Sequence, residues 1–354
     1  MMRVIDRLNP QTLRILALLV VVGLVLLFFS LVVPNYLNGR LFNRISSSVA
    51  IMALIATAQT LVIITRNIDL SIGSVVGFVA FATGSLVSNN PDIGPVALVA
   101  YAMVLGAMFG AINGALVAFA RVPSIIVTLG TMALFRSALV EYSGSTSIST
   151  ANLPQWLVSF PNAVLWQWGG MQFRAGFVAA VAVVLLVHVA LTRLRAARRL
   201  YAIGSNPEAA AMAGIDTGRT VFVAFVLAGA LAGLGGFMFL ARFGTITVVA
   251  GLGFELKSVA ASVVGGVNIF GGSGTVIGAL IGAILVDLID SSLVRWALVS
   301  EFWREAVLGV LILLSVATDA LLMRRLMAAR QAREHRKAED RIAAELAAQQ
   351  GAKA

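Results

Sequence analysis

The chain has 354 residues, of which 59% are hydrophobic and only 12% are charged, and its mean hydropathy is +0.95. Soluble domains carry about 25% charged residues because they need a polar surface, so this composition excludes a soluble globule and indicates a protein that crosses a membrane many times. The net charge of +10 does not indicate nucleic-acid binding, because the arginines gather at the N-terminus, in one interior loop and in the C-terminal tail, where they set membrane topology.

Apolar runs long enough to span a membrane recur along the chain. Crossing roughly 30 Å of hydrocarbon takes about 20 apolar residues. The first run follows a basic flank, but it is longer than a signal-peptide core and lacks a cleavage site, so we expect it to remain as a span. The expected fold class is therefore all-α, integral membrane, with about ten transmembrane helices in one bundle. The spans are predicted near residues 13–33, 47–65, 70–88, 95–120, 124–141, 173–192, 220–241, 256–270, 275–293 and 302–323.

The eighth predicted span, 256–270, is short and rich in glycine, so it is a candidate for a broken or re-entrant segment. Together the spans form one domain, 1–323, and a charged tail follows at 324–354. The acids and bases Glu255, Lys257, Asp287 and Asp290 are expected near span ends, mostly as interfacial pairs.

Arginine distribution predicts the orientation. Four arginines fill the start of the loop 193–219 and five more follow the last span between 324 and 336, whereas 142–172 contains no lysine or arginine. Because cytoplasmic loops carry the excess of these residues, we expect both termini and the loop 193–219 to be cytoplasmic and 142–172 to be external. Arg40 and Arg44 do not fit, since this scheme places them outside.

Glycines repeat every four residues at Gly106, Gly110 and Gly114, and with the same spacing at Gly229 and Gly233. Small residues on one helix face let two helix backbones approach closely where lipid supplies no hydrophobic drive for association. These faces predict tight helix packing and say nothing of function.

Two polar turns have similar sequences. Residues 67–77 and 268–278 each place an asparagine and small polar residues between two spans, and transporters often contain internal repeats with interrupted helices beside the substrate path. Asp69 has two interpretations: it caps the following helix, with Arg66 reaching the membrane surface, or it shapes an inner gate. The gate or turn candidates are Arg66, Asn67, Asp69, Ser71 and Gly73, with Asn268, Gly271, Gly272, Ser273 and Gly274 in the second turn.

The cytoplasmic loop specifies a short helix. Asn206 is a good N-cap, Pro207 suits the first helical position, Glu208 favours the positive helix end, and Gly214 ends the helix. A helix of about two turns is marginal in water, so we expect it to dock on a partner; the alternative is a connector lying on the lipid surface.

Four motifs carry a family resemblance. Residues 66–74 (RNIDLSIGS), 122–131 (VPSIIVTLGT), 202–215 (AIGSNPEAAAMAGI) and 264–278 (VGGVNIFGGSGTVIG) together resemble the permeases of bacterial ribose, xylose, rhamnose and autoinducer-2 importers. The resemblance covers nearly the whole chain. Within the group it is most similar to the rhamnose permeases, partly through 150–156 (TANLPQW).

The resemblance implies an ATP-driven importer in a bacterial inner membrane, with rhamnose as the first expected cargo. Its expected partners are a second permease subunit (identical or not), a cytoplasmic ATP-binding subunit, an extracytoplasmic sugar-binding protein and membrane lipid. No cofactor or metal is expected on this chain: Gly271–Gly274 lacks the lysine of a phosphate loop, so ATP and magnesium would sit on the partner, and the chain is not expected to be an enzyme. The implied ATPase-coupling residues are Asn206, Pro207, Glu208, Ala209, Ala210 and Gly214.

A sugar path needs hydrogen-bonding side chains. The pathway candidates are Gln59, Thr60, Asn113, Thr128 and Thr131, with Asn67 and Asn268 from the two turns.

Other functions stay open. A permease for autoinducer 2, another pentose or hexose, or branched-chain amino acids would follow the same logic with another cargo. An ion-coupled secondary transporter would need a buried acid in mid-span, for which Asp69 and Asp287 are the residues to test. A membrane-embedded enzyme gains little support, because no HExxH, catalytic serine motif, metal cluster or cysteine occurs in the sequence.

Overall fold

The computed structural model describes residues 10–296 and, beyond them, 303, 306–307, 309–310 and 313–314. The predicted all-α membrane fold is confirmed: eight of the helices in this part are long and apolar enough to cross a membrane. The tenth predicted span, 302–323, lies largely outside the described residues, and the tail 324–354 lies wholly outside them. The helices are α2 Pro10–Val32, α3 Gly39–Ile64, α4 Ile72–Asn89, α5 Pro95–Ala118, α6 Ser124–Ser143, α7 Gln155–Ser159, α8 Ala175–Arg193, α9 Arg195–Ser205, α10 Pro207–Met212, α11 Thr217–Phe243, α12 Phe254–Val264 and α13 Val276–Arg295.

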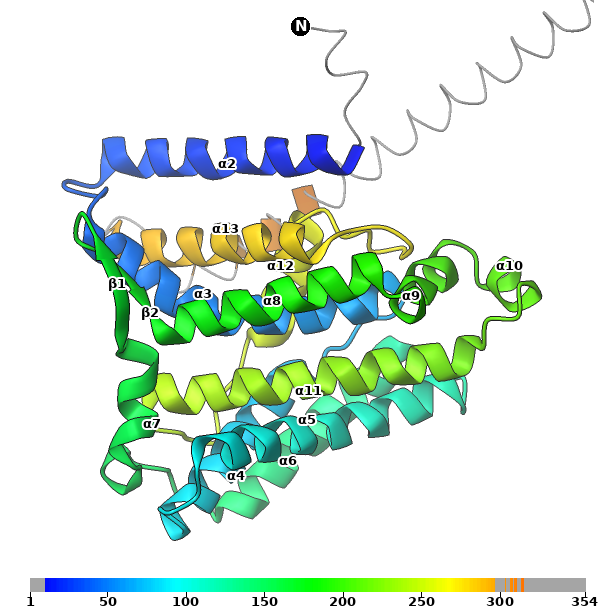
Figure 1. The fold of residues 1–354 in the computed structure, drawn as a ribbon, viewed down its shortest axis with the longest axis horizontal. Coiled ribbons are helices and arrows are strands. Elements are labelled where there is room, and N and C mark those ends of the chain that lie inside the picture. The colour runs from blue at the N-terminus through cyan, green and yellow to red at the C-terminus, as the bar shows by residue number, and fades with distance from the viewer. Residues whose placement is uncertain (1–9, 297–302, 304–305, 308, 311–312, 315–354) are drawn as a thin grey trace, which may run out of the picture.

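The long helices run side by side, so the bundle has two ends (Figure 1). Helices α9 and α10 lie at one end, called here the α10 end. At the other, the hairpin end, strands β1 (Val164–Trp168) and β2 (Met171–Arg174) pair antiparallel next to α7. The span predicted to start at 173 begins as a helix only at Ala175, because Met171–Arg174 form β2. Trp166 and Trp168 lie on β1, and Gly169 and Gly170, both with positive φ, form the turn.

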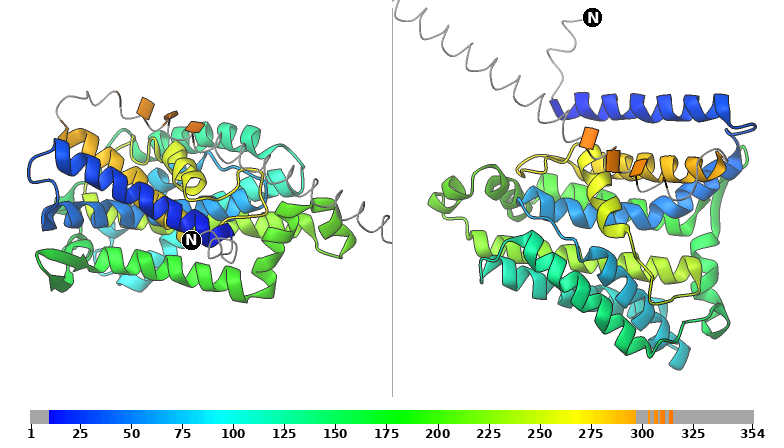
Figure 2. Two further views of the ribbon diagram at one scale, coloured as in Figure 1. Left: turned by 90° about the horizontal axis from the view of Figure 1, so that it is seen from above. Right: turned by 180° about the vertical axis from the view of Figure 1, so that it is seen from behind.

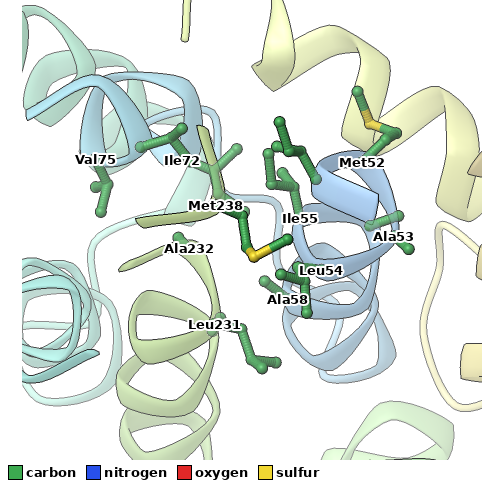
Figure 3. Packing of buried hydrophobic residues seen from close by; sticks show 14 of the residues in the cluster. Met52, Ala53, Leu54, Ile55, Ala58, Ile72, Val75, Leu231, Ala232 and Met238 are labelled. Carbon is green, nitrogen blue, oxygen red and sulfur yellow. The ribbon is translucent and has the colours of Figure 1, made fainter. Parts of the chain in front are cut away.

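Helix α3 forms the centre of the core. Every residue from Val49 to Ile64 is buried, as expected for a helix that is apolar all round and enclosed by others. Figure 3 shows α3 side chains such as Leu54 and Ile55 meeting Ile72 of α4 and Met238 of α11. The first polar turn therefore follows directly on a buried central helix.

The glycine faces pack α5 on α11, as predicted. Gly106 faces Gly229 and Gly233, and Gly110 faces Gly229 and the backbone of Phe225; a Cβ added at Gly106 or Gly110 would overlap a carbonyl oxygen of α11. This contact holds two spans at backbone distance without large side chains.

One crossing of the membrane is only half helical. Helices α11 and α13 both run from the α10 end to the hairpin end, so residues 244–275 must return between them (Figures 1 and 2). Helix α12 has 11 residues, a length of about 16 Å, roughly half the hydrocarbon core. The prediction of a short or broken eighth segment is confirmed, with its helix ending at Val264 rather than 270; the return is completed by non-helical chain at 244–253, called here the entry segment.

Candidate functional site

At the α10 end, Arg66 joins the first polar turn to the end of α9. Its Nε donates to the carbonyl of Gly204 (2.6 Å) and its Nη2 to that of Ser205 (2.7 Å). The last carbonyls of a helix have no partner within the helix, so Arg66 caps α9 from outside. Arg66 itself has a φ of +66°, which is uncommon for a residue with a side chain. In this conformation its guanidinium makes both hydrogen bonds to α9.

The second polar turn meets the same place. The backbone N–H of Gly272 donates to the carbonyl of Ile64, at the end of α3 (2.9 Å), and the Tyr201 hydroxyl donates to the carbonyl of Gly274 (3.1 Å). A Cβ at Gly204 would overlap the Ile64 carbonyl, so only glycine permits this approach. The Tyr201 phenol is protonated at neutral pH and can donate, and burial raises its pKa further.

These contacts define an inner junction, made of Arg66, Tyr201, Gly204, Ser205 and Gly272. The sequence had placed Arg66 and Gly272 in two candidate gate turns and the 193–219 loop in a third, separate group; the structure brings all three together. Tyr201, Gly204 and Ser205 were missed, because α9 was not predicted as a helix of its own. The signal that could have found it is the amphipathic stretch Arg195–Ser205, whose buried residues are Leu200, Ile203 and Gly204.

Helix α10 follows the junction and is built as predicted. The Asn206 side chain accepts from the N–H of Ala209 (3.0 Å), Pro207 takes the first turn, and Gly214 has a φ of +79°. Apart from Ala210, which is buried, most of its side chains are exposed, Glu208, Ala209 and Met212 among them. The short helix therefore projects from the bundle and presents a free surface, while Asn206 ties its start directly to the junction.

Beside the junction a hollow of about 630 Å³ opens at the same end. Arg66, Arg121 and Arg219 line it together with Asp216, which pairs with Arg219 at 3.1 Å. Asn67 also lines this hollow, and its side chain donates to the carbonyl of Thr65 (2.9 Å). In the second turn the Asn268 side chain accepts from the N–H of Phe270 (3.0 Å), and the Ser273 carbonyl accepts from the N–H of Asn268 (3.0 Å).

The turn before α4 lies inside the bundle, where Asp69 and Ser71 are buried. The Asp69 carboxylate accepts from the N–H and hydroxyl of Ser71 (2.9 and 2.7 Å), and Asn113 donates to the Ser71 hydroxyl (2.7 Å). Gln59 and Asn113 each lie five residues before the end of their helix, so the turn sits about 7 Å inside the α10 end. The prediction that Asp69 caps α4 is wrong: Ser71 is the N-cap, and no side chain caps this helix. The Asp69 carboxylate binds the N–H of Ser71 instead, which stabilises the turn before α4.

All five pathway candidates are buried within the protomer. The Gln59 amide, in the orientation that satisfies both groups, pairs with the backbone of Asp69 (3.0 and 3.3 Å). Thr128 donates to the carbonyl of Ile68 (3.2 Å), Thr131 to that of Thr128 (3.4 Å) and Thr60 to that of Ala56 (2.7 Å). Three of them, Gln59, Asn113 and Thr128, therefore bind the turn before α4, and a role in conducting cargo stays a prediction.

The entry segment is held by an arginine that sequence reasoning missed. Arg136, in α6, donates from Nη1 to the carbonyls of Val248 (2.8 Å) and Ala250 (2.7 Å). Non-helical backbone at membrane depth is tolerated only where its polar groups find partners in the protein, and Arg136 supplies two. A lone arginine inside a predicted span is by itself a functional signal.

The entry segment packs against helix α4. Gly251 lies on Gly73 and Ala250 lies on Gly77. A Cβ at Gly73 would overlap the Gly251 carbonyl oxygen, and a Cβ at Gly77 would overlap the Ala250 carbonyl oxygen. The candidate turn residue Gly73 thus serves the close approach of two broken segments. In transporters, interrupted helices of this kind are found beside substrate sites.

Comparison with known proteins agrees with this architecture. Residues 41–316 match a family described as branched-chain amino acid transport system / permease component. The autoinducer 2 import system permease protein LsrC of Enterobacter sp. (strain 638) is 36% identical over 289 residues, covering 82% of this chain and 81% of the relative. The proteins of the same name from Yersinia pseudotuberculosis serotype IB (35%, covering 81% and 79%) and Shigella flexneri (33%, covering 81% of each) are similar over 290 residues.

No solved structure matches the chain. The relatives named above are autoinducer 2 permeases and give no support to the expectation of rhamnose. The matched region takes in every element of the inner junction, the entry segment and α10. This chain therefore belongs to the branched-chain amino acid transport system permease component family of multi-pass membrane proteins.

Proposed function

We propose that the chain is the membrane-spanning subunit of an ATP-driven importer, working with a second permease subunit, a cytoplasmic ATP-binding subunit and an external binding protein. The observation that carries the proposal is the inner junction: the exposed helix α10, capped by Asn206, follows directly on α9, and the last carbonyls of α9 accept hydrogen bonds from Arg66 of the first polar turn. ATP and magnesium would be bound by the partner subunit.

The orientation follows from charge. Arg66, Arg121, Arg219 and the four arginines of 193–199 all lie at the α10 end (Figure 1), so this end faces the cytoplasm under the positive-inside rule. The arginines at the hairpin end are fewer and remain exceptions: Arg40 and Arg44 at the start of α3, Arg174 at the end of β2, and Arg242 and Arg295 in the last turns of α11 and α13. An ATPase would thus meet α10, and a binding protein would meet α7 and the hairpin.

In this mechanism α10 moves with the ATPase. Arg66 binds the end of α9, and Tyr201 of α9 binds Gly274 of the second turn. A displacement of α10 together with α9 would therefore shift both polar turns. Rigid-body displacement of packed elements is a common route of alternating access.

For the cargo, the relatives favour autoinducer 2, with rhamnose or another monosaccharide as the next candidates and branched-chain amino acids after them. The test is ATP-driven uptake into vesicles that contain the permease, its ATPase and a loaded binding protein. Autoinducer 2 should be taken up, and the cargo that is taken up identifies the substrate.

Docking of α10 can be tested separately. Glu208→Lys should abolish co-purification of the ATPase, since it reverses a charge on the exposed face of α10. Asp92→Lys makes the same charge change on an exposed residue near the hairpin end and should leave co-purification intact. Equal recovery of ATPase with both variants would refute docking through α10.

An ion-coupled transporter is favoured by one observation. Asp287 was expected near a span end, but it lies eight residues before the end of α13, about 12 Å inside it. Its oxygen accepts from Ser48 and it faces Arg242. This candidate requires uptake that stops when a proton gradient is collapsed and continues without ATP.

A further inference from the structure

An apolar cavity of about 540 Å³, called here the α9 cavity, lies between α8, α9 and α11 at the α10 end. Figure 1 shows α8 and α11 running side by side, with α9 at their α10 end. Leucines of all three helices line the cavity: Leu191 and Leu194 of α8, Leu200 of α9, and Leu227 and Leu231 of α11. Its charged lining residues, Arg199, Asp216 and Arg219, all lie at the α10 end. The cavity is therefore apolar in its depth and charged at its mouth.

The α9 cavity is about as long as one leaflet of a bilayer is thick. Asp216, the N-cap of α11, and Leu231 both line it, and their 15 positions of separation correspond to about 22 Å along the helix. A bilayer with its headgroups is about 40–45 Å thick, so one leaflet takes up about 20–22 Å. The charged mouth then lies at the level of the headgroups, and the leucines lie at the level of the acyl chains.

Arginines gather at this mouth. Arg199 and Arg219 line it, and three more exposed arginines lie beside it at the end of α8 and in α9: Arg193, Arg195 and Arg198. In the described part of the chain, only Arg219 of these five has a side-chain hydrogen bond or ion pair. Its Nε pairs with Asp216 at 3.1 Å, which leaves both Nη groups for another acceptor. Asp216 is the one acid in the lining, and Glu208, the other acid of 193–219, lies outside it.

Helix α9 is amphipathic. Leu200, Ile203 and Gly204 are buried, whereas its arginines are exposed. A helix with a basic face and an apolar face suits the headgroup region of a membrane. Setting the topology needs only the positive charge of the loop, and does not require an apolar cavity beneath the arginines. Basic pockets between membrane-spanning helices on the cytoplasmic side are sites where anionic lipid headgroups bind.

The combination of mouth and depth selects one class of occupant. Inorganic phosphate would match the arginines but leave the apolar cavity unfilled, and a lipid without net charge would fill the cavity but not neutralise the arginines. A helix of a second subunit would cover the leucines, but it would bury several arginines that have no carboxylate partner in the described residues, which is costly.

We propose that the α9 cavity binds an anionic phospholipid of the inner leaflet, with its phosphate on Arg199 and Arg219 and an acyl chain between α8 and α11. Arginine suits this role because its planar donor group matches phosphate oxygens. The inference rests on the orientation in the proposed function, in which the α10 end faces the cytoplasm. Because α9 contributes Tyr201, Gly204 and Ser205 to the inner junction, the lipid would hold the segment that leads into α10.

The test is lipid retention by the full-length permease, purified without its ATPase and mixed with equal amounts of phosphatidylglycerol and phosphatidylcholine. Native mass spectrometry should show at least about tenfold more phosphatidylglycerol bound, the preference expected from hydrogen bonds between charged groups. Arg199→Gln combined with Arg219→Gln should lose this preference. Arg40→Gln combined with Arg44→Gln removes the same charge from exposed residues outside the cavity and should keep it.

The apolar part of the cavity has its own variant. Leu227→Trp places a larger side chain in the lining and should lower the retention of both lipids, because both carry acyl chains. Leu186→Trp, on an exposed part of α8 outside the lining, should not. A wild-type Tm in lipid-free detergent shows that each variant is folded, and an excess of inorganic phosphate should not displace the bound lipid.

The leaflet can be tested because the sequence contains no cysteine. The thiol of Arg198→Cys should react with a membrane-impermeant reagent only after spheroplasts are opened. Labelling of intact spheroplasts would place the α9 cavity in the outer leaflet and overturn the proposal.

Other outcomes would also overturn it. These are equal retention of the two lipids by the wild type, an unchanged preference in the Arg199 and Arg219 double variant, and displacement of the lipid by inorganic phosphate. Separation of paired permease subunits in that double variant would instead assign the cavity to a subunit interface. Because retention is measured without ATPase or cargo, a lack of ATP-driven uptake would refute the proposed function and leave the lipid site standing.

Discussion

Replacement of Arg66 by alanine tests whether the inner junction transmits movement. The change removes two hydrogen bonds from a charged donor, to Gly204 and Ser205, which are worth about 1.5–3 kcal/mol each when shielded. Because the bond to Ser205 is exposed, we expect a total loss of about 2–4 kcal/mol. The lower figure corresponds to a roughly 30-fold more frequent opening of the α9 end.

The assay is hydrogen exchange of residues 200–206 in the assembled transporter, together with the number of cargo molecules taken up per ATP hydrolysed. Arg66→Ala should speed exchange there and lower the uptake per ATP, while ATPase still co-purifies through α10. Arg66→Lys keeps the charge but not the two-pronged donor geometry, and should behave like alanine. Wild-type exchange and wild-type uptake per ATP in Arg66→Ala would refute the reasoning.

Three further substitutions have defined outcomes. Arg136→Met leaves two carbonyls of the entry segment without donors and should destabilise the protein by about 2–4 kcal/mol, seen as a lower Tm in detergent; an unchanged Tm would mean that the segment needs no such support. Gly106→Ala places a Cβ against the Gly229 carbonyl and should lower Tm by several degrees, whereas Gly130→Ala, with open space at that position, should not; equal effects would contradict backbone packing of α5 on α11. Asn206→Ala should weaken α10 by about 1 kcal/mol and reduce ATPase affinity, and Asn206→Asp should retain both; identical affinity of the two variants would show that the cap does not matter.

Local features of the structure were predictable from the sequence. The spans follow from apolar runs, and α10 follows from Asn206, Pro207 and Gly214, because capping and helix termination depend on neighbouring residues. The glycine faces were predictable for the same reason, but their partners were not. The sequence contains several faces of small residues, and only the structure shows that Gly106 packs on Gly229 and Gly233.

The rest depends on contacts between distant segments. Nothing near Arg66 in the sequence indicates that its guanidinium ends on Gly204, 138 residues away. The span that holds Asp287 was placed almost correctly, at 275–293 against Val276–Arg295, but its partner Ser48 lies on a distant helix, so the sequence did not show that the carboxylate has a partner inside the bundle. The hairpin was missed because its strands are short and rich in aromatic residues, which also suit a membrane interface; the Gly169–Gly170 pair was the available turn signal.

The most direct test of the central claim is the energy source of uptake in sealed vesicles that contain the wild-type permease, its ATPase and a loaded binding protein. The account predicts accumulation of autoinducer 2, or another small hydroxylated cargo, that requires ATP and persists when ion gradients are collapsed. Uptake that needs a proton or sodium gradient and proceeds without ATP would contradict it, and would make Asp287 the first residue to test as a coupling group.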